Sequence, residues 1–147
     1  MKFEFGNLHF DGELRSKWDM LLRIVGDFAI IIGCRRLYAE VEFCLVEFAV
    51  ALANWLATAS DNGPDFVYTS MESESEGLVR FTLCGPGAWL VSAAHQDYAE
   101  PIQLTTEQLM EAAGAYVNEL REALLPGIDI FDHVESKDTL ATIQSWR

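Results

Sequence analysis

The stretch FVYTSMESESEGLVRFTLCGPGAWLVSAA, residues 66–94, decides the fold class, because apolar side chains recur at every second position through much of it. Such alternation is typical of strands with one buried face. It predicts strands at 66–72, 78–84 and 88–94, and Gly85, Pro86 and Gly87 predict a tight hairpin turn between the last two. The stretch therefore indicates an antiparallel meander.

An acidic row interrupts this meander. Glu72, Glu74 and Glu76 occupy alternate positions, so in an extended chain their carboxylates would project from one face roughly 7 Å apart. This spacing is below the Debye length of about 8 Å at physiological salt, and the charges would repel one another. Two interpretations follow: the row keeps a sheet end soluble and protects its edge, or it docks a cationic partner.

Two helices are predicted, one on each side of the meander. Residues 44–58 are apolar in nearly every direction, which favours a buried central helix that ends in the turn-forming sequence SDNGPD. After the meander, Thr105 and Gln108 form a capping-box pattern, and Pro126 with Gly127 marks the helix end. The apolar stripe of this second helix consists of Leu109, Met110, Ala113, Tyr116, Val117, Leu120 and Leu124.

The N-terminal third is less regular. We expect a short strand at KFEF, residues 2–5, a strand at about 20–32, a turn at GCRR, and a half-exposed strand in which Leu37, Ala39, Val41 and Phe43 alternate with glutamates. Residues 14–25 also fit a helix face. With a tail at 127–147 that holds a short helix near Ser136, the chain is predicted to be one α+β domain, 1–147. Its antiparallel sheet has about five to six strands, and two main helices pack against it.

The charge of the chain is concentrated in its middle. The 147 residues carry a formal net charge of −13, and residues 37–120 hold thirteen Asp and Glu against a single base, Arg80. Such a field repels nucleic acid and anionic lipid, and it attracts cationic partners. We therefore expect neither nucleic acid nor a membrane as a partner.

Export and redox signals are also missing. The N-terminal sequence MKFEFGNLHF has no continuous apolar run of the kind a signal peptide needs, and the longest apolar stretch, 48–57, is too short to span a bilayer. We expect a cytoplasmic protein. Cys34, Cys44 and Cys84 are an odd number in apolar surroundings, which favours buried, reduced thiols over disulfides or a zinc site.

Catalytic motifs are not evident. No phosphate-binding loop, nucleophile elbow or HExxH pair occurs, and Trp55 and Trp89 fit core positions. His95 could form an acid/base unit with Asp97 or Glu100, although a surface histidine is the commoner outcome. The tail side chains Asp129, Asp132, His133 and Glu135 could bind a metal in principle, yet such a group is more often a solvated tail. No catalytic residue, metal or cofactor is predicted.

The order of these segments resembles a known protein class. An apolar helix containing LANWL, the strands DFVYTSME, GLVRFTL and AWLVSA, and a capped amphipathic helix are together similar to small bacterial immunity proteins of contact-dependent inhibition and other polymorphic toxin systems. The resemblance covers roughly residues 20–124 and rests on layout. It implies a protein without a catalytic site of its own, which binds a cognate toxin domain and blocks the toxin's active site.

The charge argument and the resemblance agree on the kind of partner. Many such toxins are nucleases with basic clefts, which an acidic surface can fill as a phosphate mimic. The predicted partner-binding residues are Asp61, Asp65, Glu72, Glu74, Glu76, Asp97, Tyr98 and Glu100. Two alternatives stay open: a small cytoplasmic enzyme that uses His95, and an acidic chaperone or scaffold subunit.

Overall fold

The computed structural model describes residues 1–13, 17–72, 76–98 and 102–124. They form seven strands and three helices in an α+β arrangement. The elements in chain order are β1 (Lys2–Phe10), α1 (Lys17–Arg23), β2 (Ile24–Ile32), β3 (Arg35–Cys44), α2 (Leu45–Leu56), β4 (Phe66–Tyr68), β5 (Val79–Gly85), β6 (Ala88–Ala93), β7 (Gln103–Thr105) and α3 (Thr106–Leu124).

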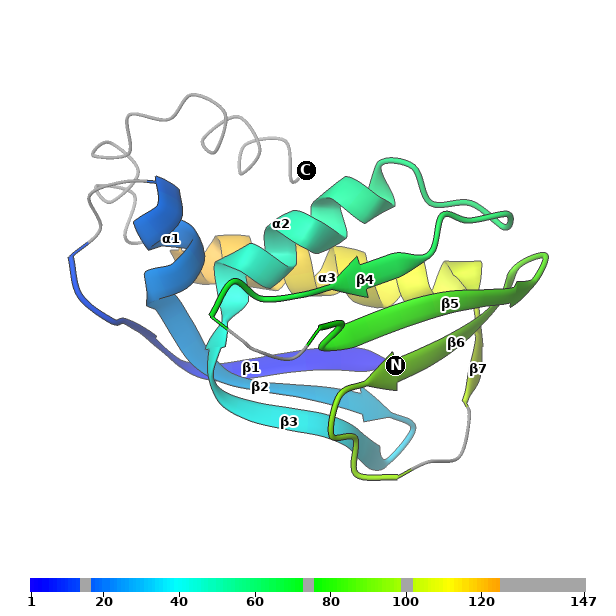
Figure 1. The fold of residues 1–147 in the computed structure, drawn as a ribbon, viewed down its shortest axis with the longest axis horizontal. Helices are drawn as coiled ribbons and strands as arrows, with labels where there is room; N and C mark the ends of the chain where they lie inside the picture. The colour runs from blue at the N-terminus through cyan, green and yellow to red at the C-terminus, as the bar shows by residue number, and fades with distance from the viewer. Residues whose placement is uncertain (14–16, 73–75, 99–101, 125–147) are drawn as a thin grey trace.

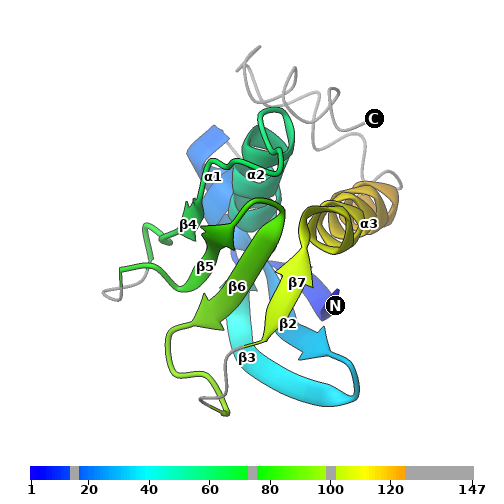
Figure 2. The same cartoon turned by 90° about the vertical axis from the view of Figure 1, so that its right-hand side faces the viewer.

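The strands form two antiparallel sheets. The first has the order β1-β2-β3, and the second has the order β4-β5-β6-β7. In Figure 1 the first sheet lies along the bottom, the second occupies the right-hand half, and α2 and α3 lie above the first sheet. Figure 2 confirms from the side that both helices lie on one side of the first sheet. In the described part of the chain, the lower face of that sheet is therefore covered by no helix.

The core fills the space between the two sheets and the two long helices. Phe28 of the first sheet stacks on Phe43 with ring centroids 4.1 Å apart, and it meets Phe48 of α2 edge to face at 5.0 Å. On the second sheet Trp89 is fully buried and lies 5.6 Å from Trp55 of α2. Both predicted core tryptophans are thus confirmed, and burial of this much aromatic surface is the main source of stability.

The capping box of α3 forms as its sequence predicts. The Thr105 backbone N–H donates to Gln108 Oε1 at 2.9 Å, and the Gln108 N–H donates to Thr105 Oγ1 at 3.2 Å. The predicted stripe is buried except for Met110, which is 37% exposed. Tyr116 from this stripe donates a hydrogen bond to the Leu45 carbonyl oxygen at 2.9 Å, so α3 is fixed to the start of α2.

The predicted fold class is confirmed, and its details are refined. Antiparallel strands at residues 66–94 and both main helices are present, but the strands divide into two sheets instead of one. The hairpin turn lies at Gly87, whose φ of +65° suits a residue without a Cβ. The short strand β7 was not predicted, because three residues are too few to show a period. The tail at 127–147 lies outside the described residues.

Two N-terminal predictions are wrong in part. The predicted strand at 20–32 is a helix until Arg23 and a strand from Ile24, and an Arg23–Asp19 ion pair at 2.9 Å spans one turn of that helix. The cysteines are also not all buried: Cys44 is buried, whereas Cys34 and Cys84 are exposed. Both exposed thiols lie in or beside the turns at sheet ends, where the apolar neighbours in sequence do not cover them.

Candidate functional site

The described acidic residues among those predicted from the sequence lie in different segments and take part in separate contacts. Asp65, directly before β4, is bound to β5, because its Oδ1 accepts a hydrogen bond from the Leu83 N–H at 2.9 Å. Asp61 is exposed in the turn after α2, and its carbonyl oxygen accepts a hydrogen bond from the Gly87 N–H at 2.7 Å. Both residues therefore have a structural role within the fold.

At its two described positions, Glu72 and Glu76, the predicted row of glutamates does not lie in a strand. β4 ends at Tyr68, Glu72 lies in a turn, and Glu76 lies in a bend before β5. The Glu72 N–H donates to Ser70 Oγ at 3.2 Å, which favours the turn over an extended chain. Glu72 and Glu76 are exposed, whereas Glu74 and Glu100 lie outside the described residues.

Asp97 and Tyr98 connect the second sheet to the first. Arg36 Nε donates to Asp97 Oδ2 at 2.9 Å, and the Arg35 guanidinium lies over the Tyr98 ring, 3.8 Å from its centroid. The Asp97 N–H also donates to the Leu37 carbonyl oxygen at 2.7 Å. The basic groups predicted for a partner are, at these two positions, supplied by the chain itself.

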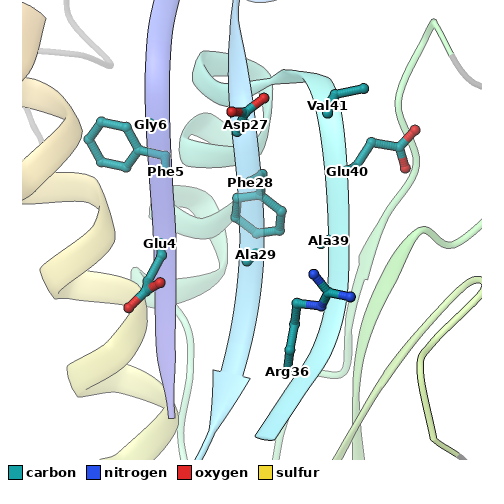
Figure 3. A pocket seen from close by; sticks show the side chains of 10 residues that line it. All are labelled: Glu4, Phe5, Gly6, Asp27, Phe28, Ala29, Arg36, Ala39, Glu40 and Val41. Carbon is teal, nitrogen blue, oxygen red and sulfur yellow. The ribbon is translucent and has the colours of Figure 1, made fainter.

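A different surface has the geometry of a site. The outer face of the β1-β2-β3 sheet is open, and it contains a shallow depression of about 400 Å³ near its centre (Figure 3). Small residues form its floor, because Gly6 lies opposite Asp27 and Ala29 lies opposite Ala39 in the strand register. The residues that line it are Glu4, Phe5, Gly6, Asp27, Phe28, Ala29, Arg36, Ala39, Glu40 and Val41.

Two β-bulges lie on either side of Asp27. Between Gly6 and His9, β1 has one residue more than β2, and β3 has one more than β2 opposite Asp27. Asn7 and Glu42 take left-handed backbone conformations at these bulges, with φ of +49° and +53°. A bulge bends its strand and redirects the following side chains, and non-glycine residues in this conformation are strained. Strain on both sides of one residue is a feature of functional sites.

The bulge in β3 breaks the alternation of buried and exposed residues that was predicted for this strand. Leu37 and Phe43 are buried as predicted, whereas Ala39 is exposed and Val41 is 71% exposed. A second extra residue near Leu37 lets Tyr38 be buried beside it. Each extra residue reverses the face on which the next side chains lie, so a strict period of two does not hold over ten residues.

Hydrogen bonds hold the bulge side chains in place. Asn7 Nδ2 donates to Asp27 Oδ2 at 2.5 Å, and His9 Nε2 lies 3.0 Å from a Glu42 carboxylate oxygen across the sheet. His9 Nδ1 contacts the Asn7 carbonyl oxygen at 2.6 Å. This contact raises the pKa of His9 above its usual value, and the nearby Glu42 carboxylate adds to the effect.

The carboxylate of Glu40 is held by a buried tyrosine. Tyr38 OH donates a hydrogen bond to Glu40 Oε2. Burial of the Tyr38 ring raises its pKa, and so does the Glu40 carboxylate, so the hydroxyl stays protonated and remains a donor. Glu40 is therefore held by a neutral group, and its side chain is directed beyond the β3 edge, away from Ala39 (Figure 3).

The candidate catalytic and metal groups are not assembled in the described residues. Asp97 pairs with Arg36, and no hydrogen bond joins it to His95, which is exposed with φ of +57°. Among residues 1–13, 17–72, 76–98 and 102–124, no three His, Cys, Asp or Glu side chains are grouped so that they could hold a metal ion. The tail residues Asp129, Asp132, His133 and Glu135 lie outside these ranges.

The chain belongs to the family defined by the domain of unknown function DUF7878, which matches residues 1–125. No curated protein and no solved structure matches the chain. Within the described residues, none of the helices has the length and apolar character needed to cross a membrane.

One part of the missed site had a signal in the sequence. In FEFGNLHF the apolar residues are Phe3 and Phe5, then Leu8 and Phe10, so the alternation moves from odd to even positions across Gly6 and Asn7. Such a shift within one strand indicates a bulge. The bulge at Glu42 has no comparable signal, because Glu40, Val41 and Glu42 keep the expected polar and apolar order.

Proposed function

We propose that this chain is an immunity-type protein, which binds a cationic toxin domain in the cytoplasm and neutralises it by covering the toxin's active site. The resemblance in layout to small bacterial immunity proteins supports this proposal. A nuclease toxin binds its phosphate substrate in a basic cleft, and an acidic protein surface can fill such a cleft.

The observation that carries the proposal is a supply of carboxylates without basic partners. Glu76, before β5, and Glu107, Glu111 and Glu119, on α3, are exposed and form no ion pair with any other described residue. Carboxylates left in this state repel one another and speed association with a basic partner. Such an excess also keeps a protein soluble, and it matches the basic cleft of a cationic enzyme.

The test uses the C-terminal domain of the protein encoded immediately upstream. We expect the purified chain to abolish that domain's activity at a one-to-one ratio, with an association rate that falls steeply as salt rises. An association rate independent of salt would remove the electrostatic argument. Turnover by the chain itself that is lost in His95→Ala would replace this proposal with the enzyme alternative.

A further inference from the structure

The open face of the first sheet has the chemistry of a docking surface. Resting on the proposed function above, we propose that the outer face of β1-β2-β3 is the contact surface for the cationic partner, and that its central depression receives an arginine or lysine side chain of that partner. Three features of the depression fit such a side chain: its shape, its charge and the way its carboxylates are fixed.

The shape suits one long side chain presented by a protein surface. The depression measures about 400 Å³, at the lower end of the ~300–1,000 Å³ typical of small-molecule pockets, yet it is open to solvent along the sheet face. A small ligand would stay largely exposed there. A side chain carried by a second protein surface would be covered by that surface as it docks.

The floor of the depression is apolar, and its rim is acidic. Ala29 and Ala39 lie side by side at its centre, with Val41 next to them on β3. Asp27 lies at one end, and Glu40 lies at the β3 edge (Figure 3). Lysine and arginine have the complementary form, because a long aliphatic stem carries a cationic head.

The rim carboxylates Asp27 and Glu40 have neutral groups as their hydrogen-bond donors. Asp27 accepts its hydrogen bond from the neutral Asn7 amide, and Glu40 accepts its own from the neutral Tyr38 hydroxyl. The base that lines the depression, Arg36, is already paired with Asp97 at 2.9 Å. The local balance is therefore negative, and charge complementarity selects a cation.

The remaining acid of the rim is only loosely engaged. Glu4 pairs with Lys2 at 3.6 Å, and both side chains are more than half exposed, at 51% and 61%. Ion pairs of this kind contribute little to stability and exchange readily for a better partner. A guanidinium entering the depression can therefore recruit the Glu4 carboxylate as well as Asp27.

A second copy of this chain is a weaker occupant. Lys2 and Arg36 lie at one end of the same face and Asp27 at the other, so two copies could in principle pair head to tail. The net charge of −13 on each copy opposes that pairing over the whole surface. Dimerisation is nevertheless an outcome that the experiment below detects.

The first experiment uses a defined peptide and the full chain. An acetylated and amidated Gly-Ala-Arg-Ala-Gly peptide is titrated into isotopically labelled protein, with its citrulline counterpart as the neutral isostere. We expect amide shifts at Gly6, Ala29 and Ala39 for the arginine peptide and none for citrulline. Shifts located elsewhere, or equal shifts for both peptides, would overturn the proposal.

Three variants extend this titration. Asp27→Asn removes one carboxylate without changing the shape of the side chain. We expect it to lower the affinity for the arginine peptide by roughly tenfold, because a charge-assisted contact is lost. Ala39→Lys places a cation in the depression and should abolish binding even if Asp27→Asn folds poorly. Glu122→Gln is the matched control, because Glu122 is an exposed carboxylate near the end of α3 that does not line the depression. Weakening by Glu122→Gln alone would overturn the proposal.

The final step separates this inference from the proposed function. If the upstream toxin domain binds wild type and Ala39→Lys equally well, the docking surface is elsewhere and this inference is overturned while the immunity function stands. If the toxin domain does not bind wild type but the arginine peptide binds at Ala29 and Ala39, the function fails and the site remains. A wild-type dimer that Ala39→Lys dissociates would instead assign the face to self-association.

Discussion

The two sheets of this protein differ in regularity. In the second sheet β4 pairs with β5, and β7 pairs with β6, without a register shift. The single register shift of this sheet lies between β5 and β6, beside their turn. The first sheet has three shifts, of which two flank Asp27. The outer face of the second sheet bears a single charged strand residue, Arg80, whereas the outer face of the first bears charges of both signs around a depression. Both sheets supply core residues from their inner faces, and the comparison teaches that only the irregular sheet adds a charged outer face with a depression.

The largest expected effect tests the structural role of the second sheet. Trp89→Ala removes a fully buried ring and a 2.8 Å hydrogen bond from Nε1 to Thr106 Oγ1, and it should lower the free energy of unfolding by about 3–5 kcal/mol. Thr82→Ala on the outer face of the same sheet should change it by less than about 0.5 kcal/mol. Urea unfolding of both variants measures the difference. A small loss for Trp89→Ala would mean that the part of the core beneath the second sheet contributes little to stability.

The next effect tests how tightly the bulged strands approach each other. A Cβ added at Gly26 would lie 2.5 Å from the Gly6 carbonyl oxygen, so Gly26→Ala should cost about 1–3 kcal/mol by displacing the β1 backbone. The matched control is Gly85→Ala in the second sheet, where the nearest atom to the added Cβ is 3.9 Å away. Equal melting temperatures for the two variants would contradict the close approach at the bulge.

A third change should stabilise the protein. Glu42 has φ of +53°, so Glu42→Gly should relieve a backbone strain of about 1 kcal/mol. The variant also loses the exposed ion pair with His9, which contributes less to stability than this strain costs. Glu42→Ala is the control, since it removes the same carboxylate but keeps the strained backbone. Thermal melts should rank the glycine variant above the alanine variant. The reverse order would show that this bulge is not strained.

The smallest expected effect concerns pH. Because the pKa of His9 is raised in the folded state, its charged form is favoured by folding. The stabilisation is complete below the unfolded pKa of about 6.5, and it is lost as the pH rises through the folded pKa. His9→Gln should therefore lower the melting temperature slightly at about pH 5.5 and leave it unchanged at about pH 8.5. A pH-independent difference would exclude the charged pair as its cause.

Local rules were sufficient to predict the β5–β6 hairpin of the second sheet and α3 from the sequence. Alternation identified β5 and β6 with their turn, and the Thr105 and Gln108 pattern predicted a capping box that the structure contains. These features depend on neighbours within a few residues. The same rules identified Trp55 and Trp89 as core.

The candidate site could not be predicted in this way, because it depends on pairing between distant segments. Asp27 gains its setting from Asn7, twenty residues earlier, and from a bulge in β3. Asp97 and Tyr98 appeared available in the sequence, yet they meet Arg36 and Arg35, about sixty residues away. Acidic residues are easy to find in a sequence, but their charge-balancing partners are fixed only by the tertiary fold.

Each sheet carries one exposed thiol that a reagent can reach, and the third thiol is buried. Cys34 is exposed in the turn between β2 and β3, and Cys84 is exposed on β5, whereas burial protects Cys44 and raises its pKa to about 11. A maleimide reagent near neutral pH should therefore label the first two and spare the third. A donor and acceptor dye placed at these positions without any mutation would report the separation of the two sheets. Energy transfer between them would then show whether partner binding moves the sheets relative to each other.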